Sequence, residues 1–174
     1  VKPANAGSSV GITKAHNKEE LMEGLKVAAV HDSKIVVEEG IVGREIECAV
    51  LGNRGHVEAS CVGEIFSAGE FYDYDAKYNN AESKTVVPAE ISPEKQDEIR
   101  KMAVKVFNAV DGSGLARVDF FVENETENVI FNELNTLPGF TPISMYSMLW
   151  AACGKSTAEL LDNLIELALE RFSL

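Results

Sequence analysis

Apolar and polar residues alternate along several short segments of the chain, which is the pattern of half-buried β-strands. In one of them Ile46, Cys48 and Val50 form the apolar side, and the positions between them are polar or small. A polar, glycine-containing turn at 52–55 separates this segment from the next one and predicts a hairpin. The expected strands cover residues 34–38, 43–51, 56–65, 115–123 and 129–135, with a further short strand at 12–14.

Four other segments carry apolar residues at helical spacing. Three of them begin at residues whose side chains commonly cap helices, namely Asn17, Ser92 and Ser156. Glu159, three residues after Ser156, completes a capping box. A fourth helix is expected at 143–153. This order of strands, helix, strands and helices predicts an α+β fold with a largely antiparallel sheet flanked by helices.

The charge of the chain restricts its partners. Among 174 residues, 16 lysines and arginines stand against 28 aspartates and glutamates, which gives a formal charge of −12. Such a chain lacks the overall cationic character of proteins that bind a nucleic-acid backbone. No apolar run reaches the roughly 20 residues of a membrane span. We therefore expect neither nucleic acid nor a membrane as a partner.

The cysteines and the first residues indicate where the protein works. Cys48, Cys61 and Cys153 have no metal-binding spacing and are expected to be small core residues. An odd number of thiols, with no visible leader, favours the cytoplasm. The chain does not begin with Met and opens in what resembles the end of a strand, so we expect a mature product or a fragment.

The two late strands carry the strongest candidate site. Side chains two apart on a strand share a face, so a hairpin of 115–123 and 129–135 would gather a cation, two carboxylates and an amide between two aromatic rings. Carboxylate and amide oxygens suit Mg²⁺ that is held partly by substrate phosphates. A solvated strand face is the alternative. The expected members are Arg117, Asp119, Glu133 and Asn135, flanked by Phe121 and Phe131.

Two loops have compositions that suit anion binding. Residues 4–11 are small, so their backbone N–H groups, together with Ser8 and Ser9, could hold a phosphate beside Lys2. A flexible connector and a surface lysine are the alternatives. The tyrosine-rich segment 71–78 could close over a pocket, or it could be a surface loop pinned by its own aromatic rings.

A third loop, residues 135–144, contains two prolines and a glycine and leads from the second late strand into a helix. Its last residue, Ser144, would put a hydroxyl and helix N–H dipoles where a carboxylate can dock. Ordinary helix capping explains the same placement.

In this order, five segments resemble the ATP-grasp D-alanine–D-alanine ligases. They read VKPANAGSSVG, VVEEGIVGREIECAVLGN, FYDYDAKY, GLARVDFF and FNELNTLPGFTPIS, and they extend from residue 1 to about residue 150. The resemblance implies an ATP-grasp enzyme that joins two D-alanines through a D-alanyl phosphate for peptidoglycan synthesis. It also implies ATP and two Mg²⁺ ions, which Mn²⁺ could replace.

On the nucleotide side, the resemblance implies that Lys2 and the serine loop contact the phosphates, that the segment 38–41 meets the adenine, and that Glu45 binds the ribose. Glu39 stands where some members of the family have a lysine near the adenine. The residues implied in nucleotide binding are Lys2, Ser8, Ser9, Glu38, Glu39, Ile41, Glu45, Lys77 and Phe121.

On the reaction side, the resemblance implies that Asp119 and Glu133 share one Mg²⁺ and that Glu133 and Asn135 hold the second. Arg117 would stabilise the tetrahedral transition state. Ser144 would bind the carboxylate of the second D-alanine, beside Gly139. The implied catalytic residues are Arg117, Ser8, Lys77, which would contact the transferred phosphate, and Tyr78, which belongs to the lid.

The resemblance also divides the chain. Residues 1–41 would be the C-terminal part of the central nucleotide-binding domain, and residues 42–174 the C-terminal domain with the Mg²⁺ and D-alanine sites. The family's first domain, which binds the first D-alanine, would precede residue 1, so we expect the chain alone to be inactive or nearly so. The family tends to form homodimers, largely through that preceding part.

Three alternatives stay open. A ligase of the same group could use D-serine or D-lactate as its second substrate, although FYDYDAKY favours alanine over lactate. Another ATP-grasp ligase, such as a carboxylase subunit, is disfavoured by the long tyrosine loop and by PGFTPIS. A non-catalytic nucleotide-binding module would bind ADP tightly without turnover.

Overall fold

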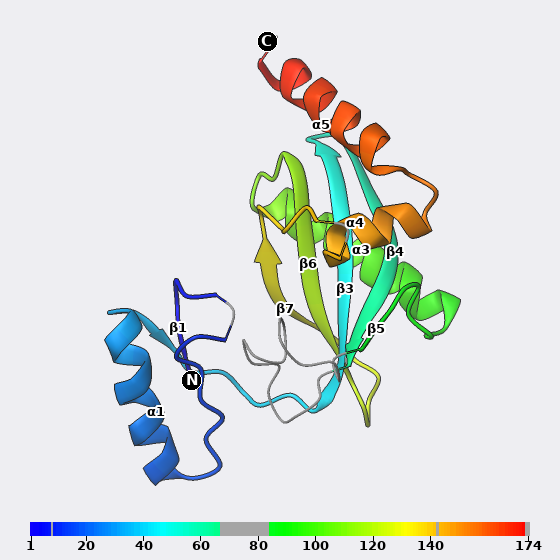
Figure 1. Ribbon diagram of the computed structural model, residues 1–174. Coiled ribbons are helices and arrows are strands. Elements are labelled where there is room, and N and C mark those ends of the chain that lie inside the picture. Colours follow the sequence, from blue (N-terminus) through cyan, green and yellow to red (C-terminus); the bar gives the residue numbers. More distant parts are fainter. Residues whose placement is uncertain (8, 67–83, 142, 173–174) are drawn as a thin grey trace. The chain divides into compact units, whose positions relative to one another are not determined.

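The computed structural model describes residues 1–7, 9–66, 84–141 and 143–172. Its contacts divide the chain into two compact units, and each is described by itself. Val1–Ile41 belong to the first, which we call the N-terminal unit; Val42–Phe66 and Thr85–Leu174 form the second, which we call the sheet unit. Figure 1 labels the elements of both units.

The N-terminal unit contains helix α1 (Lys18–His31). The helix begins as predicted at Asn17, whose side chain accepts a hydrogen bond of 2.9 Å from the backbone N–H of Glu20. The preceding loop packs against the end of the helix at Gly11, where φ is +74°. A Cβ at Gly11 would lie 2.5 Å from Cδ2 of His31. Both this close approach and the positive φ therefore require a glycine at this position.

Two short strands, β1 (Lys2–Pro3) and β2 (Ile35–Val36), pair antiparallel beside this helix. The predicted strand at 12–14 was wrong. Thr13 instead exchanges two backbone hydrogen bonds of 2.9 Å with Val1, which is too short a contact to form a strand of its own.

The sheet unit is built on five strands in the order β5-β4-β3-β6-β7. β3 pairs antiparallel with both β4 and β6, and β6 pairs antiparallel with β7, so the α+β fold with a largely antiparallel sheet is confirmed. The strands are β3 (Gly43–Asn53), β4 (His56–Phe66), β5 (Lys84–Val86), β6 (Gly114–Glu123) and β7 (Val129–Asn135).

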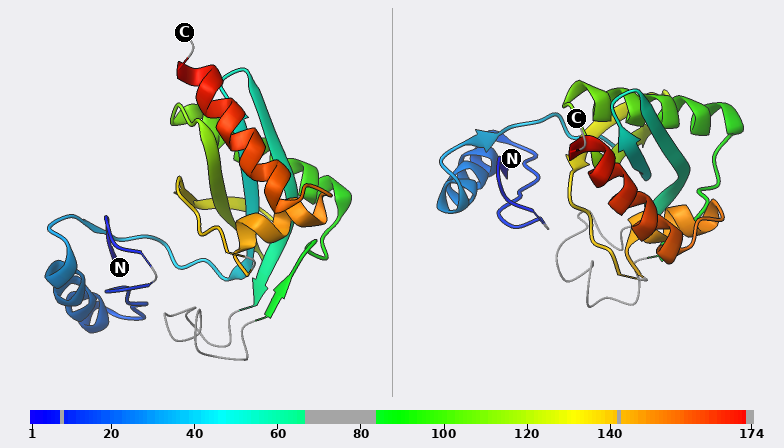
Figure 2. Two further views of the ribbon diagram at one scale, coloured as in Figure 1. Left: turned by 45° about the horizontal axis from the view of Figure 1, so that its top comes forward. Right: turned by 90° about the horizontal axis from the view of Figure 1, so that it is seen from above.

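Helix α3 (Pro93–Ala109) covers one face of this sheet, and Figure 2 shows it on the side opposite to the last two helices. Ser92 caps the helix, accepting a hydrogen bond from the backbone N–H of Lys95. Ile99, Ala103 and Phe107 are almost fully buried against the strands. The strand residues beneath them are Ile46, Cys48, Val50, Val62, Ala116, Val118, Phe120 and Val122.

Helices α4 (Met145–Ala152) and α5 (Thr157–Phe172) cover part of the opposite face. Tyr146, Leu149 and Trp150 of α4 form a second core with Ala49 and Leu51 of β3. The rest of this face carries the charged residues of the candidate site, so α4 and α5 limit the site to one end of the sheet.

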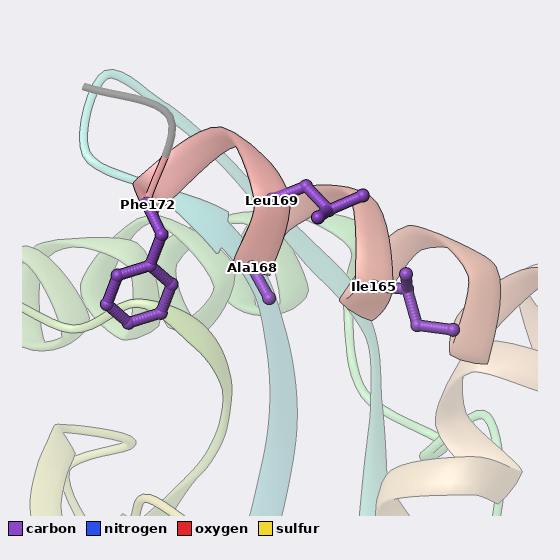
Figure 3. Close-up of a pocket in the computed structure, with 4 residues that line it drawn as sticks. All are labelled: Ile165, Ala168, Leu169 and Phe172. Atoms are coloured by element: carbon purple, nitrogen blue, oxygen red, sulfur yellow. The ribbon is translucent and has the colours of Figure 1, made fainter.

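The predicted capping box at the start of α5 is formed. The backbone N–H of Ser156 donates to Glu159 at 2.8 Å, and that of Glu159 donates to the Ser156 hydroxyl at 3.3 Å. The outer side of α5 has an apolar pocket lined by Ile165, Ala168, Leu169 and Phe172 (Figure 3). These side chains are all apolar and offer no group for catalysis.

The expectation that all three cysteines are core residues is only partly right. Cys48 is buried and Cys61 half-buried, but Cys153 is exposed. Burial raises the pKa of both Cys48 and Cys61 to about 12. In the part of the chain that the structure describes, no helix is long and apolar enough to cross a bilayer.

Candidate active site

The charged residues of the two late strands meet on one face of the sheet. In the register of β6 and β7, Asp119 lies opposite Glu133, and Arg117 lies opposite Asn135. Residues that face each other across antiparallel strands have Cβ atoms about 4.5–5.5 Å apart, so a single ligand can contact both members of such a pair. The predicted hairpin and the shared face of these four side chains are therefore confirmed.

Arg117 holds Asp119 with two parallel hydrogen bonds. Its Nε donates to Oδ1 at 2.8 Å and its Nη2 donates to Oδ2 at 2.7 Å. Burial alone would lower the pKa of Arg117, but the hydrogen bonds to Asp119 and the charges of Glu47, Asp119 and Glu133 outweigh it and raise the pKa. Arg117 is therefore a fixed cation whose orientation is set by its carboxylate partners.

A third carboxylate, Glu47 of β3, extends this group of charges across three strands. It lies opposite Asp119, its Oε2 is 3.1 Å from Nε of Arg117, and its side chain is 8% exposed. Glu47 was not among the residues predicted for the site. Its alternation with Ile46 and Cys48 correctly places it on the face away from α3, but the pairing of β3 with β6 could not be derived from that pattern.

The oxygens of Asp119, Glu133 and Asn135 fit Mg²⁺. This ion usually takes one or two carboxylates and completes its octahedron with water and substrate phosphates. Glu133 is exposed and accessible to such a ligand, whereas both oxygens of Asp119 accept hydrogen bonds from Arg117. Among the described residues, no group of three or more His, Cys, Asp or Glu side chains has the geometry of a metal site.

Phe131 does not flank the site, contrary to the prediction. The pairing of β6 with β7 shifts between Asp119 and Phe120, because β7 has one extra residue, Asn132, at this point. Phe131 consequently lies opposite Phe120 on the α3 side, where the two rings make an edge contact with centroids 6.2 Å apart. A strict alternation over 129–135 misses this bulge.

Ser144 immediately precedes α4 and is its N-cap residue, but its side chain makes no capping hydrogen bond. Its hydroxyl is bound instead to Thr141, with the backbone N–H at 3.1 Å and the hydroxyl at 2.8 Å. A Cβ at Gly139 would lie 2.9 Å from the Ser144 Oγ, so these two residues are close neighbours. Ordinary side-chain capping therefore does not explain Ser144.

The N-terminal unit contains several of the residues implied in nucleotide binding. Nζ of Lys2 forms an ion pair of 2.7 Å with Glu38 at the end of the β1–β2 pair. Glu39 is exposed, Ile41 is half-buried, and Ser9 has a positive φ of 60°. Lys2 and Glu38 are thus brought together within one unit.

The sheet unit contains the two other described members of that set, since Glu45 of β3 lies opposite Phe121 of β6. Both lie on the face of Glu47 and Asp119, one step further along each strand. Ser8, Lys77 and Tyr78 lie outside the described residues.

Solved structures with this architecture identify the class of the fold. The D-alanine-D-alanine ligase of Coxiella burnetii has a TM-score of 0.85 and is 40% identical, and the match covers 98% of this chain and 44% of that one. The VanG D-Ala:D-Ser ligase of Enterococcus faecalis has a TM-score of 0.86 and is 42% identical, and the match covers 95% of this chain and 48% of that one. The fold is that of the ATP-grasp ligases.

Within this class, the chain belongs to the D-ala D-ala ligase C-terminus family, whose model matches residues 1–166. The D-alanine--D-alanine ligase B of Clostridium tetani is 58% identical over 169 residues, which are 97% of this chain and 47% of the relative. The chain thus spans about half the length of the curated relatives it matches. The family predicted from the sequence motifs is confirmed.

Proposed function

We propose that this chain is the half of an ATP-dependent D-alanine–D-alanine ligase that binds the nucleotide, Mg²⁺ and the second D-alanine. One observation carries the proposal: Asp119 faces Glu133, and Arg117 faces Asn135, on the uncovered end of one sheet face. The names of the relatives favour D-alanine as the substrate. The product would serve peptidoglycan synthesis in the cytoplasm.

The proposed reaction has two steps. A carboxylate oxygen of the first D-alanine attacks the γ-phosphorus of ATP, which yields D-alanyl phosphate and ADP. The amine of the second D-alanine then attacks the acyl carbon, loses a proton and expels phosphate. Both steps concentrate negative charge, so the site needs fixed cations.

The residues of the sheet unit supply these requirements. Bound Mg²⁺ would neutralise phosphate charge and align the reacting groups. Asp119 and Glu133 would hold one ion, and Glu133 and Asn135 the other. Arg117 would stabilise the oxyanion of the tetrahedral transition state, because its pKa keeps it charged and its partners fix its direction. Ser144, beside Gly139, would bind the carboxylate of the second D-alanine.

For the nucleotide, we propose that the phosphates contact Lys2, Ser8, Ser9 and Lys77. Residues 38–41 would contact the adenine, and Glu45 the ribose. Phe121 would lie near the nucleotide, and Tyr78 would belong to a lid. Residues 1–41 would then be the end of the central ATP-grasp domain and 42–174 the C-terminal domain. The ion pair of Lys2 with Glu38 supports a shared role at the nucleotide. Homodimers would form through the half that the relatives have in addition.

A D-serine ligase is the second candidate function. The VanG structure, which is 42% identical to this chain, is named a D-Ala:D-Ser ligase. The chain is therefore similar to ligases named for D-alanine and to a ligase named for D-serine, and the experiment below determines which is the second substrate.

The test joins this chain to the preceding half of the Clostridium tetani relative and measures ATP-dependent phosphate release. D-alanine alone should support release and yield the dipeptide, and the Asp119→Asn plus Glu133→Gln variant should not. Release that requires added D-serine or D-lactate would identify the alternative ligases. Binding of Mg-ATP without any release would support a non-catalytic module, and the unjoined chain should show little or no turnover.

A further inference from the structure

Asp119 is placed in two roles that compete with each other. Both of its oxygens accept hydrogen bonds from Arg117, yet under the proposed function the same carboxylate binds Mg²⁺. An ion at Asp119 draws the negative charge of the carboxylate toward itself and weakens both hydrogen bonds to Arg117, even though each oxygen keeps a second lone-pair site. A second carboxylate beside Arg117 would then contribute more to holding the guanidinium in place.

Glu47 is placed to do so. Its Oε2 lies 3.1 Å from Nε of Arg117, which is the same nitrogen that donates to Asp119 Oδ1. Its side chain is 8% exposed and stands on β3, the strand at the centre of the sheet, so its position is well constrained.

The other groups around Arg117 cannot replace Glu47. The cross-strand neighbours of Arg117 are Ala49 on β3 and Asn135 on β7, neither of which carries a charge. Glu133 is exposed and is itself a proposed ion ligand.

We propose that Glu47 is a positioning residue for Arg117: it keeps the guanidinium in its catalytic orientation when Asp119 also binds the metal ion. This inference rests on the proposed function. It adds a residue whose effect on the reaction passes through Arg117, with no contact to substrate of its own.

The first experiment compares Glu47→Gln with Glu64→Gln in the protein joined to the relative's preceding half. Glu64 is a matched control because its side chain is also buried, at 4% exposed, and is also paired with an arginine. Arg44 binds it in two places, and Nε of Arg44 donates to Oε1 at 2.7 Å. Glu64 lies opposite Ile46, however, on the α3 side of the sheet and away from the site. Glu47→Gln should lower kcat at least about 10-fold with KM for ATP changed less than about 3-fold, since the lost interaction acts in the transition state. Glu64→Gln should leave kcat within about 2-fold, and an equal fall in both variants overturns the proposal.

The second experiment needs neither turnover nor metal. Asp119→Asn removes the carboxylate charge that an ion would otherwise neutralise, so it mimics the weakened hold of a metal-bound Asp119 on Arg117. The chain is labelled with ¹⁵N-arginine and studied by NMR, and the Nε–H signal of Arg117 is assigned as the one that is lost in Arg117→Lys. In Asp119→Asn this signal should stay protected from exchange with solvent. Its exchange should be at least about 10-fold faster in Asp119→Asn combined with Glu47→Gln. Equal exchange in the single and double variants overturns the proposal.

Different results would overturn the proposed function and the role of Glu47. If Arg117→Lys keeps full kcat, the proposed function of Arg117 is wrong and the role of Glu47 falls with it. If Arg117→Lys is inactive while Glu47→Gln is fully active, only the role of Glu47 is overturned. Circular dichroism of each variant confirms that the sheet is intact.

Discussion

Replacing Arg117 by methionine should destabilise the sheet unit and make its stability depend on Mg²⁺. The side chains of Arg117, Asp119 and Glu47 are only 20%, 11% and 8% exposed, so the substitution leaves two buried carboxylates without their cation. Breaking a buried ion pair in this way costs about 3–5 kcal/mol, a large part of the roughly 5–15 kcal/mol that stabilises a typical domain. Millimolar Mg²⁺ should restore part of this loss, because the ion supplies the missing positive charge.

Urea unfolding followed by the fluorescence of Trp150 measures this effect. Trp150 is the single tryptophan and is 3% exposed in the core under α4, so its emission reports on the sheet unit. Arg44→Met is the matched control, since it also leaves a buried carboxylate, Glu64, but among the described residues no second buried carboxylate lies on the same face. A loss below about 1 kcal/mol in Arg117→Met, or equal rescue by Mg²⁺ in both variants, would show that Arg117 does not stabilise the unit by neutralising its buried carboxylates.

Three further outcomes are expected. Phe107→Ala should cost about 3–5 kcal/mol in the same urea assay, because its ring is 1% exposed beneath α3; a loss under about 1 kcal/mol contradicts this packing. Glu133→Gln should weaken Mn²⁺ binding in the presence of ATP at least about 10-fold by electron paramagnetic resonance, and unchanged affinity would remove Glu133 from the metal site. Iodoacetamide at pH 8 should label exposed Cys153 before Cys61, because a pKa of about 12 keeps the thiol of Cys61 protonated. Mass spectrometry identifies which cysteine is labelled first, and the urea-unfolded chain, in which both should react, is the control.

Much of the fold follows from local patterns. Alternation identified β3, β4, β6 and β7, and capping residues located α1, α3 and α5, because both signals depend on neighbours in the sequence. The shared face of Arg117 and Asp119 follows from their spacing by two on one strand. Their meeting with Glu133 required only a hairpin, which is a short-range connection.

The features that could not be predicted depend on the pairing of distant strands or on local backbone geometry that the residue types do not fix. Glu47 joins the site because β3 lies beside β6, a pairing of residues some 70 positions apart that alternation does not report. The bond of Ser144 to Thr141 replaces helix capping because of the local turn geometry rather than the residue types. Phe131 was placed on the wrong face because a bulge changes the alternation at one residue.

The bulge at Asn132 also determines how β7 can change length during evolution. Phe131 contacts Phe120 on the α3 side and Glu133 lies on the side of the site, and deleting the extra residue between them, Asn132, would leave them on opposite faces. Loss of Asn132 would therefore convert β7 into a regular strand with both roles preserved, whereas loss of Leu134 would turn Asn135 toward the core. In an alignment of relatives, a one-residue gap at 132 is compatible with an unchanged ligand set, but the same gap two positions later is not.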